Sequence, residues 1–229
     1  MKNAEVAFHR FRFDSPFQQG FEAGGRLLVD AALVLERDDR TISATSSKSD
    51  DEIADAASQQ EFVVENWARQ DGCWIVDPHK FYREKNYRFY GYGGEAQVYS
   101  EEDNFVHKIC RIGQYDDLAQ FFERIAIENT ICPPAFLEVE GYSRLNEDFC
   151  VLLKQRFFRQ KFLMSEEDIT SYMQKLGFYE LKDESYPIIR YYSDSVIAED
   201  LHPGNIWMTE EGNVVIIDGA FRFNVRGTF

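Results

Sequence analysis

Two carboxylates and one amide are spaced so that they could meet at one point. Asp200 lies five residues before Asn205, and Asp218 lies thirteen residues after it. Between Asn205 and Asp218, two apolar stretches (206–208 and 214–217) flank a polar turn with Gly and Asn, which is the pattern of a β-hairpin. Because the two ends of a hairpin lie side by side, we expect the three side chains to converge.

Side chains of these types form a site for a hard cation. Mg²⁺ takes one or two oxygen ligands from the protein and the rest from phosphates and water. One of the three groups is then free to accept a proton or to orient a nucleophile, as phosphoryl transfer requires. The simpler structural alternative is a buried hairpin with a polar loop.

A second small-residue segment, Gly91-Tyr92-Gly93-Gly94-Glu95-Ala96-Gln97-Val98, could approach phosphate oxygens with its backbone amides. β-type patterns stand on both sides of it, so we expect a hairpin and not the strand-to-helix turn of a dinucleotide-binding or Walker loop. A tight turn without a ligand is the alternative. Lys108 follows ten residues after Val98, on the next β-type stretch. The residues 116–128 then show the clearest amphipathic helix pattern in the chain.

Taken in order, these segments resemble the protein-kinase-like superfamily. The motif Asp-Leu-His-Pro-Gly-Asn at 200–205 is most similar to the corresponding loop of aminoglycoside and choline kinases and of the small kinases of bacterial and phage polyvalent proteins. The resemblance covers residues 61–223. It implies an α+β, two-lobed protein-kinase-like fold with an antiparallel N-lobe sheet of about five strands and a reduced C-lobe. It also implies ATP and Mg²⁺ as cofactors.

The resemblance assigns roles to individual residues. Asp200, Lys108 and Asn205 would be catalytic, and Asn205 and Asp218 would ligate the metal. Lys108 would bind the phosphates while paired with a helix glutamate; Glu123 fits the family position better, and Glu128 stays open as the alternative. The remaining residues expected to bind the nucleotide are Gly91, Gly93, Gly94, Ala96, Val98 and, at the hinge whose backbone holds adenine, Gln155.

Several features depart from the family pattern. Ala198-Glu199 stand where His-Arg is usual, and Gly219-Ala220 stand where Phe-Gly is usual. The chain ends eleven residues after Asp218, so we expect neither an activation loop nor the helical subdomain that docks peptide substrates. Three functions therefore stay open: a protein kinase acting on Ser, Thr or Tyr hydroxyls, a small-molecule phosphotransferase, and a non-catalytic nucleotide-binding module. The joint presence of Lys108 and the three polar groups disfavours the third function, and the missing substrate lobe disfavours the second.

Composition limits the partners. A hydrophobic content of 44% and an aromatic content of 15% are typical of a globular protein. The formal net charge of −15 argues against general affinity for nucleic acid, which needs Lys and Arg for its phosphates. The start shows no signal-peptide pattern, and no apolar run is long enough to span a membrane. We expect a cytoplasmic protein whose partners are a nucleotide and a protein or small-molecule acceptor, and whose cysteines are reduced: Cys73, Cys110, Cys132 and Cys150.

The expected organisation has three parts: an N-terminal extension and polar linker (1–60), an N-lobe (61–157) and a reduced C-lobe (158–229). Within the first part, 26–35 could be a helix and 38–60 reads as a loop or linker. A capping-box pattern at 58–61 predicts the start of a helix that ends before Gly72, followed by a short strand at 73–76. A second capping box, beginning at Ser165, predicts a helix running to Leu176.

Overall fold

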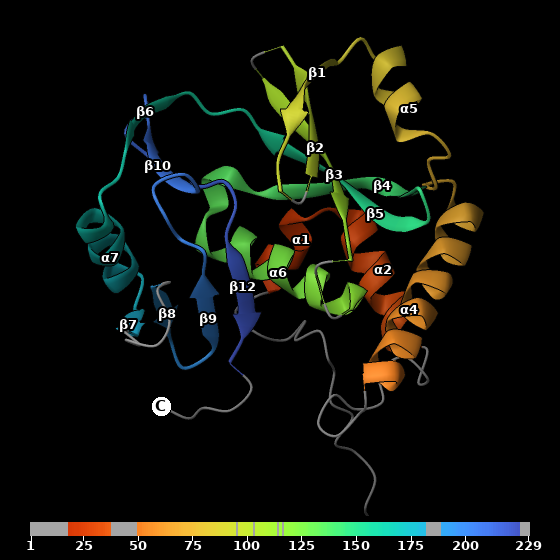
Figure 1. Cartoon of the computed structure of the whole chain (residues 1–229), viewed down its shortest axis with the longest axis horizontal. Coiled ribbons are helices and arrows are strands. Elements are labelled where there is room, and N and C mark those ends of the chain that lie inside the picture. The colour runs from red at the N-terminus through yellow and green to blue at the C-terminus, as the bar shows by residue number, and fades with distance from the viewer. Residues whose placement is uncertain are drawn as a thin grey trace, which may run out of the picture.

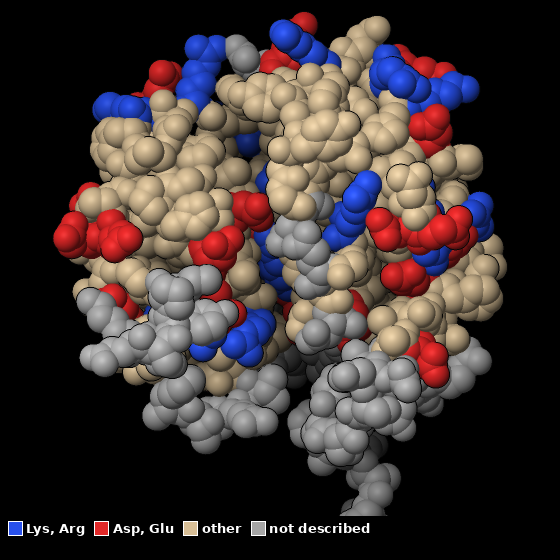
Figure 2. All heavy atoms as spheres, in the orientation of Figure 1, with Lys and Arg blue, Asp and Glu red and all other residues tan. Residues whose placement is uncertain are grey.

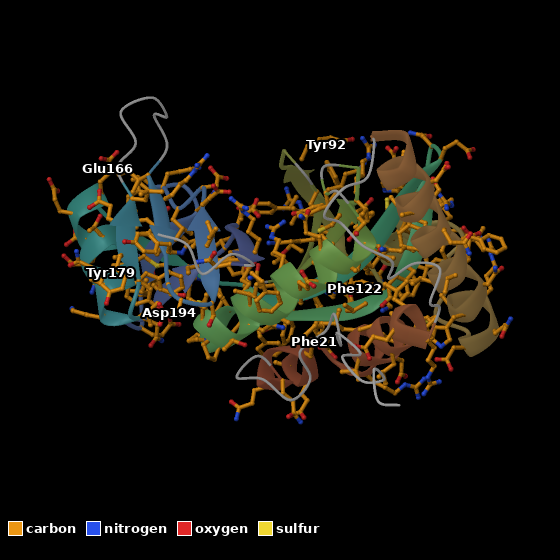
Figure 3. All side chains as sticks on the ribbon, turned by 90° about the horizontal axis from the view of Figure 1, so that it is seen from below. Phe21, Tyr92, Phe122, Glu166, Tyr179 and Asp194 are labelled. Carbon is orange, nitrogen blue, oxygen red and sulfur yellow. The ribbon has the colours of Figure 1, made fainter. Side chains whose placement is uncertain are left out.

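The computed structural model describes residues 18–37, 50–94, 96–102, 104–113, 115, 117–181 and 189–224. It is an α+β structure with two lobes lying side by side (Figure 1). Figure 3 shows the same division from below, with Phe21 and Phe122 in one lobe and Tyr179 and Asp194 in the other. None of the helices in the described ranges combines the length and the apolar character needed to cross a membrane.

The N-lobe is built on a five-stranded antiparallel sheet, as predicted, with the strand order β1-β2-β3-β5-β4. The turn between β4 and β5 has two residues with positive φ, Asn146 and Glu147, and joins two long strands whose buried residues are mostly apolar. The bounds of the strands are Arg88–Tyr92 (β1), Ala96–Glu101 (β2), Phe105–Arg111 (β3), Leu137–Leu145 (β4) and Asp148–Arg156 (β5).

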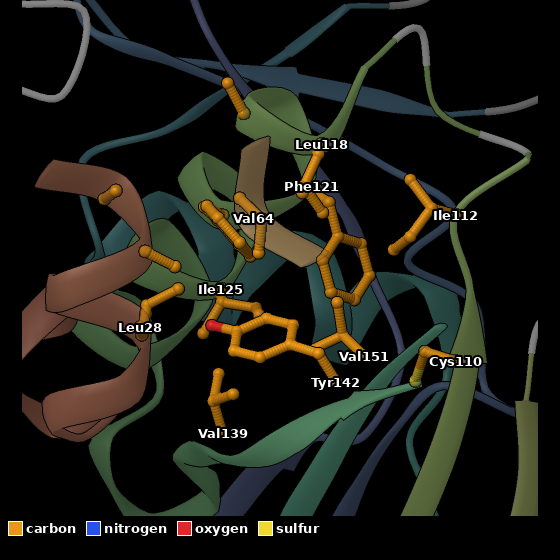
Figure 4. Packing of buried hydrophobic residues seen from close by; sticks show 14 of the residues in the cluster. Leu28, Val64, Cys110, Ile112, Leu118, Phe121, Ile125, Val139, Tyr142 and Val151 are labelled. Carbon is orange, nitrogen blue, oxygen red and sulfur yellow. The ribbon is translucent and has the colours of Figure 1, made fainter. Parts of the chain in front are cut away.

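Helices pack on both faces of this sheet: most share the hydrophobic core on one face, whereas Tyr82, in the helix of residues 78–84, packs with Tyr99, Ile109 and Leu152 on the other. Helix α6 begins after Asp117, whose side chain accepts a hydrogen bond from the backbone N–H of Gln120 and so caps the helix. Buried Tyr142 lies near the α6 side chains Phe121 and Ile125 (Figure 4), and its hydroxyl donates to the Leu27 carbonyl at 2.8 Å. The helices are α1 (Gln18–Ala23), α2 (Arg26–Arg37), α4 (Asp50–Asp71), α5 (Pro78–Glu84) and α6 (Leu118–Ile131).

Two predictions for the N-terminal part are wrong. Residues 50–60, expected to be a linker, form the first half of α4, so the capping-box pattern that begins at Ser58 lies inside a helix. Ala, Glu and Gln in this stretch are good helix formers, and an exposed Ser costs little at a helical position. The predicted helix end is confirmed, with Gly72 at φ +76°. Residues 38–49 of the expected linker lie outside the described residues.

The expected strand at 73–76 is also absent from the described structure, which has there only an isolated bridge between Trp74 and Tyr142. Helix α5 follows almost at once because Asp77 caps it and Pro78 occupies its first turn. Helices α1 and α2 share one hydrophobic core with the sheet, and α4 crosses position 60, so the structure has no boundary there.

Within its described residues, the C-lobe contains one helix and two small antiparallel sheets of strand order β11-β10-β6 and β12-β9-β8-β7. The second capping box is confirmed: Ser165 and Asp168 exchange hydrogen bonds at the start of α7 (Glu166–Lys175), and Gly177 follows with φ +85°. The strands are Gln160–Leu163 (β6), Tyr179–Leu181 (β7), Arg190–Tyr192 (β8), Val196–Glu199 (β9), Ile206–Thr209 (β10), Val214–Ile216 (β11) and Ala220–Phe223 (β12).

Helix α6 belongs to both lobes. Its residues from Leu118 to Ala126 contribute to the core under the N-lobe sheet, whereas Ile127 and the cap residue Cys132 contribute to the C-lobe core. Burial raises the pKa of the Cys132 thiol to about 11, so the thiol stays protonated near neutral pH and packs under β11 instead of acting as a nucleophile. The helix therefore forms the wall between the lobes.

Candidate functional site

A cleft of about 230 Å³ lies between the two lobes. Figure 2 shows a crevice at this position, with atoms of basic residues visible inside it. Its walls come from the N-lobe sheet, from one face of α6 and from the C-lobe hairpin. The lining residues are Gly93, Ala96, Val98, Lys108, Cys110, Leu137 and Leu153 of the sheet, Phe121, Arg124 and Ile125 of α6, and Gly204, Asn205, Trp207, Ile217 and Asp218 of the C-lobe.

The small-residue segment forms the tight β1–β2 connection that was predicted, closed by a bond from the Gly93 N–H to the Ala96 carbonyl at 2.7 Å. Gly93, Ala96 and Val98 line the cleft. Gly91 lies within β1 next to a bulge, and Gly94 borders a separate shallow depression with Tyr92 and Arg111. The structure thus places three of the five predicted residues at the cleft.

Lys108 points into the cleft from the middle of β3, where its neighbours across the sheet are Val98 and Leu153. Its ammonium group donates a hydrogen bond to the carbonyl of Ile217 at 3.0 Å, across the two lobes. Neither Glu123, which is half-buried, nor Glu128 is part of the cleft lining. The pairing of Lys108 with a helix glutamate stays a prediction.

The loop before β10 is held by its own polar groups. The Asn205 amide nitrogen donates to the backbone carbonyl and to the carboxylate of Asp200, at 3.0 Å each. The Asn205 carbonyl in turn accepts from the Ile217 N–H at 2.8 Å, which ties the loop to the residue before Asp218. The amide oxygen of Asn205 is the side-chain atom that these bonds leave for a cation.

Asp200 has a left-handed backbone conformation, with φ +59°. Such a conformation costs about 1–3 kcal/mol for a residue other than Gly, although Asp and Asn tolerate it better than most. The side chain is 55% exposed and lies outside the cleft lining, bonded to Asn205, which is part of that lining. Asp200 is therefore accessible from solvent next to the cleft.

Asp218 has a partner that the sequence did not reveal. The guanidinium of Arg124, on α6, donates to its carboxylate at 2.6 Å (Nη2 to Oδ1). Glu128, one turn further along α6, comes within 3.9 Å of the Arg124 Nε. The signal for this in the sequence is weak: Arg124 and Glu128 are opposite charges four positions apart on the helix.

Two further residues differ from expectation or were not foreseen. Gln155, expected at an adenine-binding hinge, is buried in β5 and donates to the Ala135 carbonyl at 2.7 Å; it is not part of the cleft lining. Trp207 on β10 does line the cleft, and its indole N–H is buried without a hydrogen-bond partner in the described structure. A tryptophan in a hairpin strand carries no sequence signal for ligand binding.

The donor set fits Mg²⁺ better than a metal that needs a full protein cage. No group of three or more His, Cys, Asp or Glu among the described residues is arranged to hold a metal ion. Asn205 and Asp218 together line the cleft next to Lys108, and a mixed site of this kind suits Mg²⁺ when phosphate and water complete the shell.

A two-lobed fold with a β-sheet lobe, a helix between the lobes and a cleft that contains Lys108, Asn205 and Asp218 is the architecture of a kinase-like protein. The family model described as the serine/threonine/tyrosine kinase found in polyvalent proteins matches residues 57–225. The chain belongs to this kinase family. Comparisons with curated proteins and with solved structures found no match.

Proposed function

We propose that the cleft binds Mg-ATP and that the protein transfers the terminal phosphoryl group to a hydroxyl of a protein Ser, Thr or Tyr. The observation that carries this proposal is the meeting of Lys108, Asn205 and Asp218 in one cleft, although they come from a strand of one lobe and two loops of the other. Membership of a kinase family supports the reaction class.

Each residue has a role that its surroundings support. Lys108 neutralises phosphate oxygens from the sheet side, and the small residues of the β1–β2 turn leave room for the phosphates. Asn205 and Asp218 hold the metal, which neutralises the developing charge on the transferred group. The apolar wall of Val98, Leu153 and other sheet residues is suited to the base of the nucleotide. Asp200 orients the acceptor hydroxyl and takes its proton.

The exposure of Asp200 favours a macromolecular acceptor. Its carboxylate is 55% exposed and bonded to Asn205 of the cleft lining, so a side chain on another protein can reach it. A small-molecule acceptor is the second candidate, because the Asp-Leu-His-Pro-Gly-Asn loop resembles that of aminoglycoside and choline kinases. We further propose a reducing, cytoplasmic environment, which the four free cysteines support.

The replacement Lys108→Ala tests the proposal. We expect it to lower the rate of transfer from labelled ATP by about 10²-fold or more, because phosphate charge is stabilised electrostatically in the transition state. Transfer is measured with Mg²⁺ and a cell lysate as the source of acceptors, and circular dichroism checks the fold. Lys154→Ala is the matched control, since that lysine lies on neighbouring β5 next to the Phe105 ring and outside the cleft lining. Unchanged transfer in folded Lys108→Ala would refute the assignment.

Trp207 provides a direct measure of nucleotide binding. The chain has three tryptophans, and Trp67 and Trp74 pack in the N-lobe core away from the cleft. We expect ATP to change the intrinsic fluorescence and the replacement Trp207→Phe to remove that change, while Trp67→Phe retains it. A nucleotide-dependent signal that survives in Trp207→Phe would place the nucleotide elsewhere.

A further inference from the structure

Arg124 is a buried cation inside the proposed nucleotide site. It comes from α6, is 8% exposed, and lines the same cleft as Lys108, Asn205 and Asp218. Its bond to the Asp218 carboxylate is 2.6 Å long, which is short for a charge-assisted hydrogen bond. The kinase resemblance did not predict a cation at this position of the helix.

The surroundings of Arg124 fix the guanidinium where it is. Glu128 is only 1% exposed and has its carboxylate within 3.9 Å of the Arg124 Nε. The Tyr115 ring lies 5.4 Å from the guanidinium carbon. Moving Arg124 away would leave the Glu128 charge buried without this compensation, and breaking a buried pair in this way typically costs about 3–5 kcal/mol. Because these contacts hold the Arg124 guanidinium in place, it is suited to keeping the Asp218 carboxylate in a fixed orientation.

We propose that Arg124 is a positioning residue for the metal: it fixes the Asp218 carboxylate by one oxygen so that the other faces the cation, and Glu128 holds Arg124 in place. This inference rests on the proposed function, because it takes Asp218 as a Mg²⁺ ligand. Arg124 bonds Oδ1 and leaves Oδ2 as the ligand atom. Replacing a residue that hydrogen-bonds to a metal ligand and orients it typically lowers metal affinity about 10–100-fold.

Metal affinity tests the proposal without measuring transfer. Mn²⁺ is titrated into the full chain with saturating ADP, and free Mn²⁺ is followed by electron paramagnetic resonance. We expect Arg124→Gln to weaken Mn²⁺ binding about 10–100-fold, while the affinity for ADP without metal changes by less than about threefold. Arg124→Lys keeps the charge but loses the planar fork, so its loss should be intermediate. Glu128→Gln should weaken Mn²⁺ binding in the same direction by a smaller factor.

The matched control is Arg144→Gln. Arg144 is also a partly buried arginine with two carboxylate partners, Glu61 and Glu65, but it lies at the far end of β4 and outside the cleft lining. Its replacement should leave Mn²⁺ affinity unchanged. Equal weakening in Arg144→Gln and Arg124→Gln would overturn the proposal, because the effect would then follow from general destabilisation.

Three other results would contradict the inference. Unchanged Mn²⁺ affinity in folded Arg124→Gln would make the contact with Asp218 purely structural. Tighter Mn²⁺ binding would mean that Arg124 competes with the metal and acts as a latch. Wild-type protein that binds no Mn²⁺ with ADP would refute the proposed function itself, and this inference with it. If Arg124→Gln does not fold, the Mn²⁺ affinity of Arg124→Lys is measured instead. An affinity equal to that of the wild type would then overturn the proposal.

Discussion

Replacing Asp200 by asparagine is expected to lower the rate of phosphoryl transfer about 10²–10⁴-fold, the usual contribution of a positioned general base. Nucleotide affinity should change little, because Asp200 does not belong to the lining of the cleft. Asparagine is the right replacement for two reasons. It tolerates the positive φ of this position, and its amide oxygen can still accept the bond from Asn205.

The measurement separates binding from transfer. Binding is followed by Trp207 fluorescence and transfer by labelled ATP in the same preparations. Asp194→Asn is the control, because Asp194 is an exposed residue in the β8–β9 turn. Normal transfer in Asp200→Asn would remove Asp200 from the catalytic assignment and leave its loop as a structural feature. Loss of nucleotide binding in the same variant would show that Asp200 holds the metal, so that the roles of Asp200 and Asp218 have been exchanged.

Replacing Phe122 by alanine should produce the largest loss of stability. Phe122 is fully buried on α6 and meets the Tyr142 ring edge-on, with 6.3 Å between ring centroids. Truncating a buried phenylalanine costs about 3–5 kcal/mol, because apolar contacts are lost and a cavity remains. Natural domains have only about 5–15 kcal/mol of unfolding free energy, so the variant should unfold at much lower urea concentration.

Phe62→Ala is the matched control for this experiment. Phe62 lies on α4 with 60% of its surface exposed, so its truncation should change the unfolding free energy by less than about 0.5 kcal/mol. The two variants remove the same side chain, and only burial differs. A loss below about 1 kcal/mol in Phe122→Ala would show that α6 does not hold the lobe together as its packing indicates.

The sequence by itself determined the features that depend on residues close to one another in the chain. The β-type patterns on both sides of 91–98 and around Lys108 predicted strands of the N-lobe sheet, and the polar turn between 206–208 and 214–217 predicted the C-lobe hairpin, which the structure has as β10 and β11. The capping box at Ser165 and the glycine at 72 marked helix ends correctly. Such signals are readable because capping bonds and side-chain periodicity involve residues only a few positions apart.

Local signals were wrong where two of them competed. Ser58 begins a sequence with the pattern of a capping box, yet α4 starts eight residues earlier. An N-cap residue has a non-helical backbone, and the preceding residues 50–57, rich in Asp and Ala and without Gly or Pro, do not interrupt the helix there. Apolar residues at 73–76 suggested a strand, but Asp77 and Pro78 begin a helix there and leave only the bridge at Trp74.

Only the tertiary structure decided which side chains face the cleft. Arg124 and Asp218 are 94 positions apart, and they meet because α6 packs into the cores of both lobes and so presents Arg124 to the end of β11. Gln155 turns instead to the Ala135 carbonyl and does not line the cleft, although Leu153 of the same strand does. Neither contact can be predicted from the spacing of the residues in the sequence. Both depend on how helices and strands pack against each other in the assembled core.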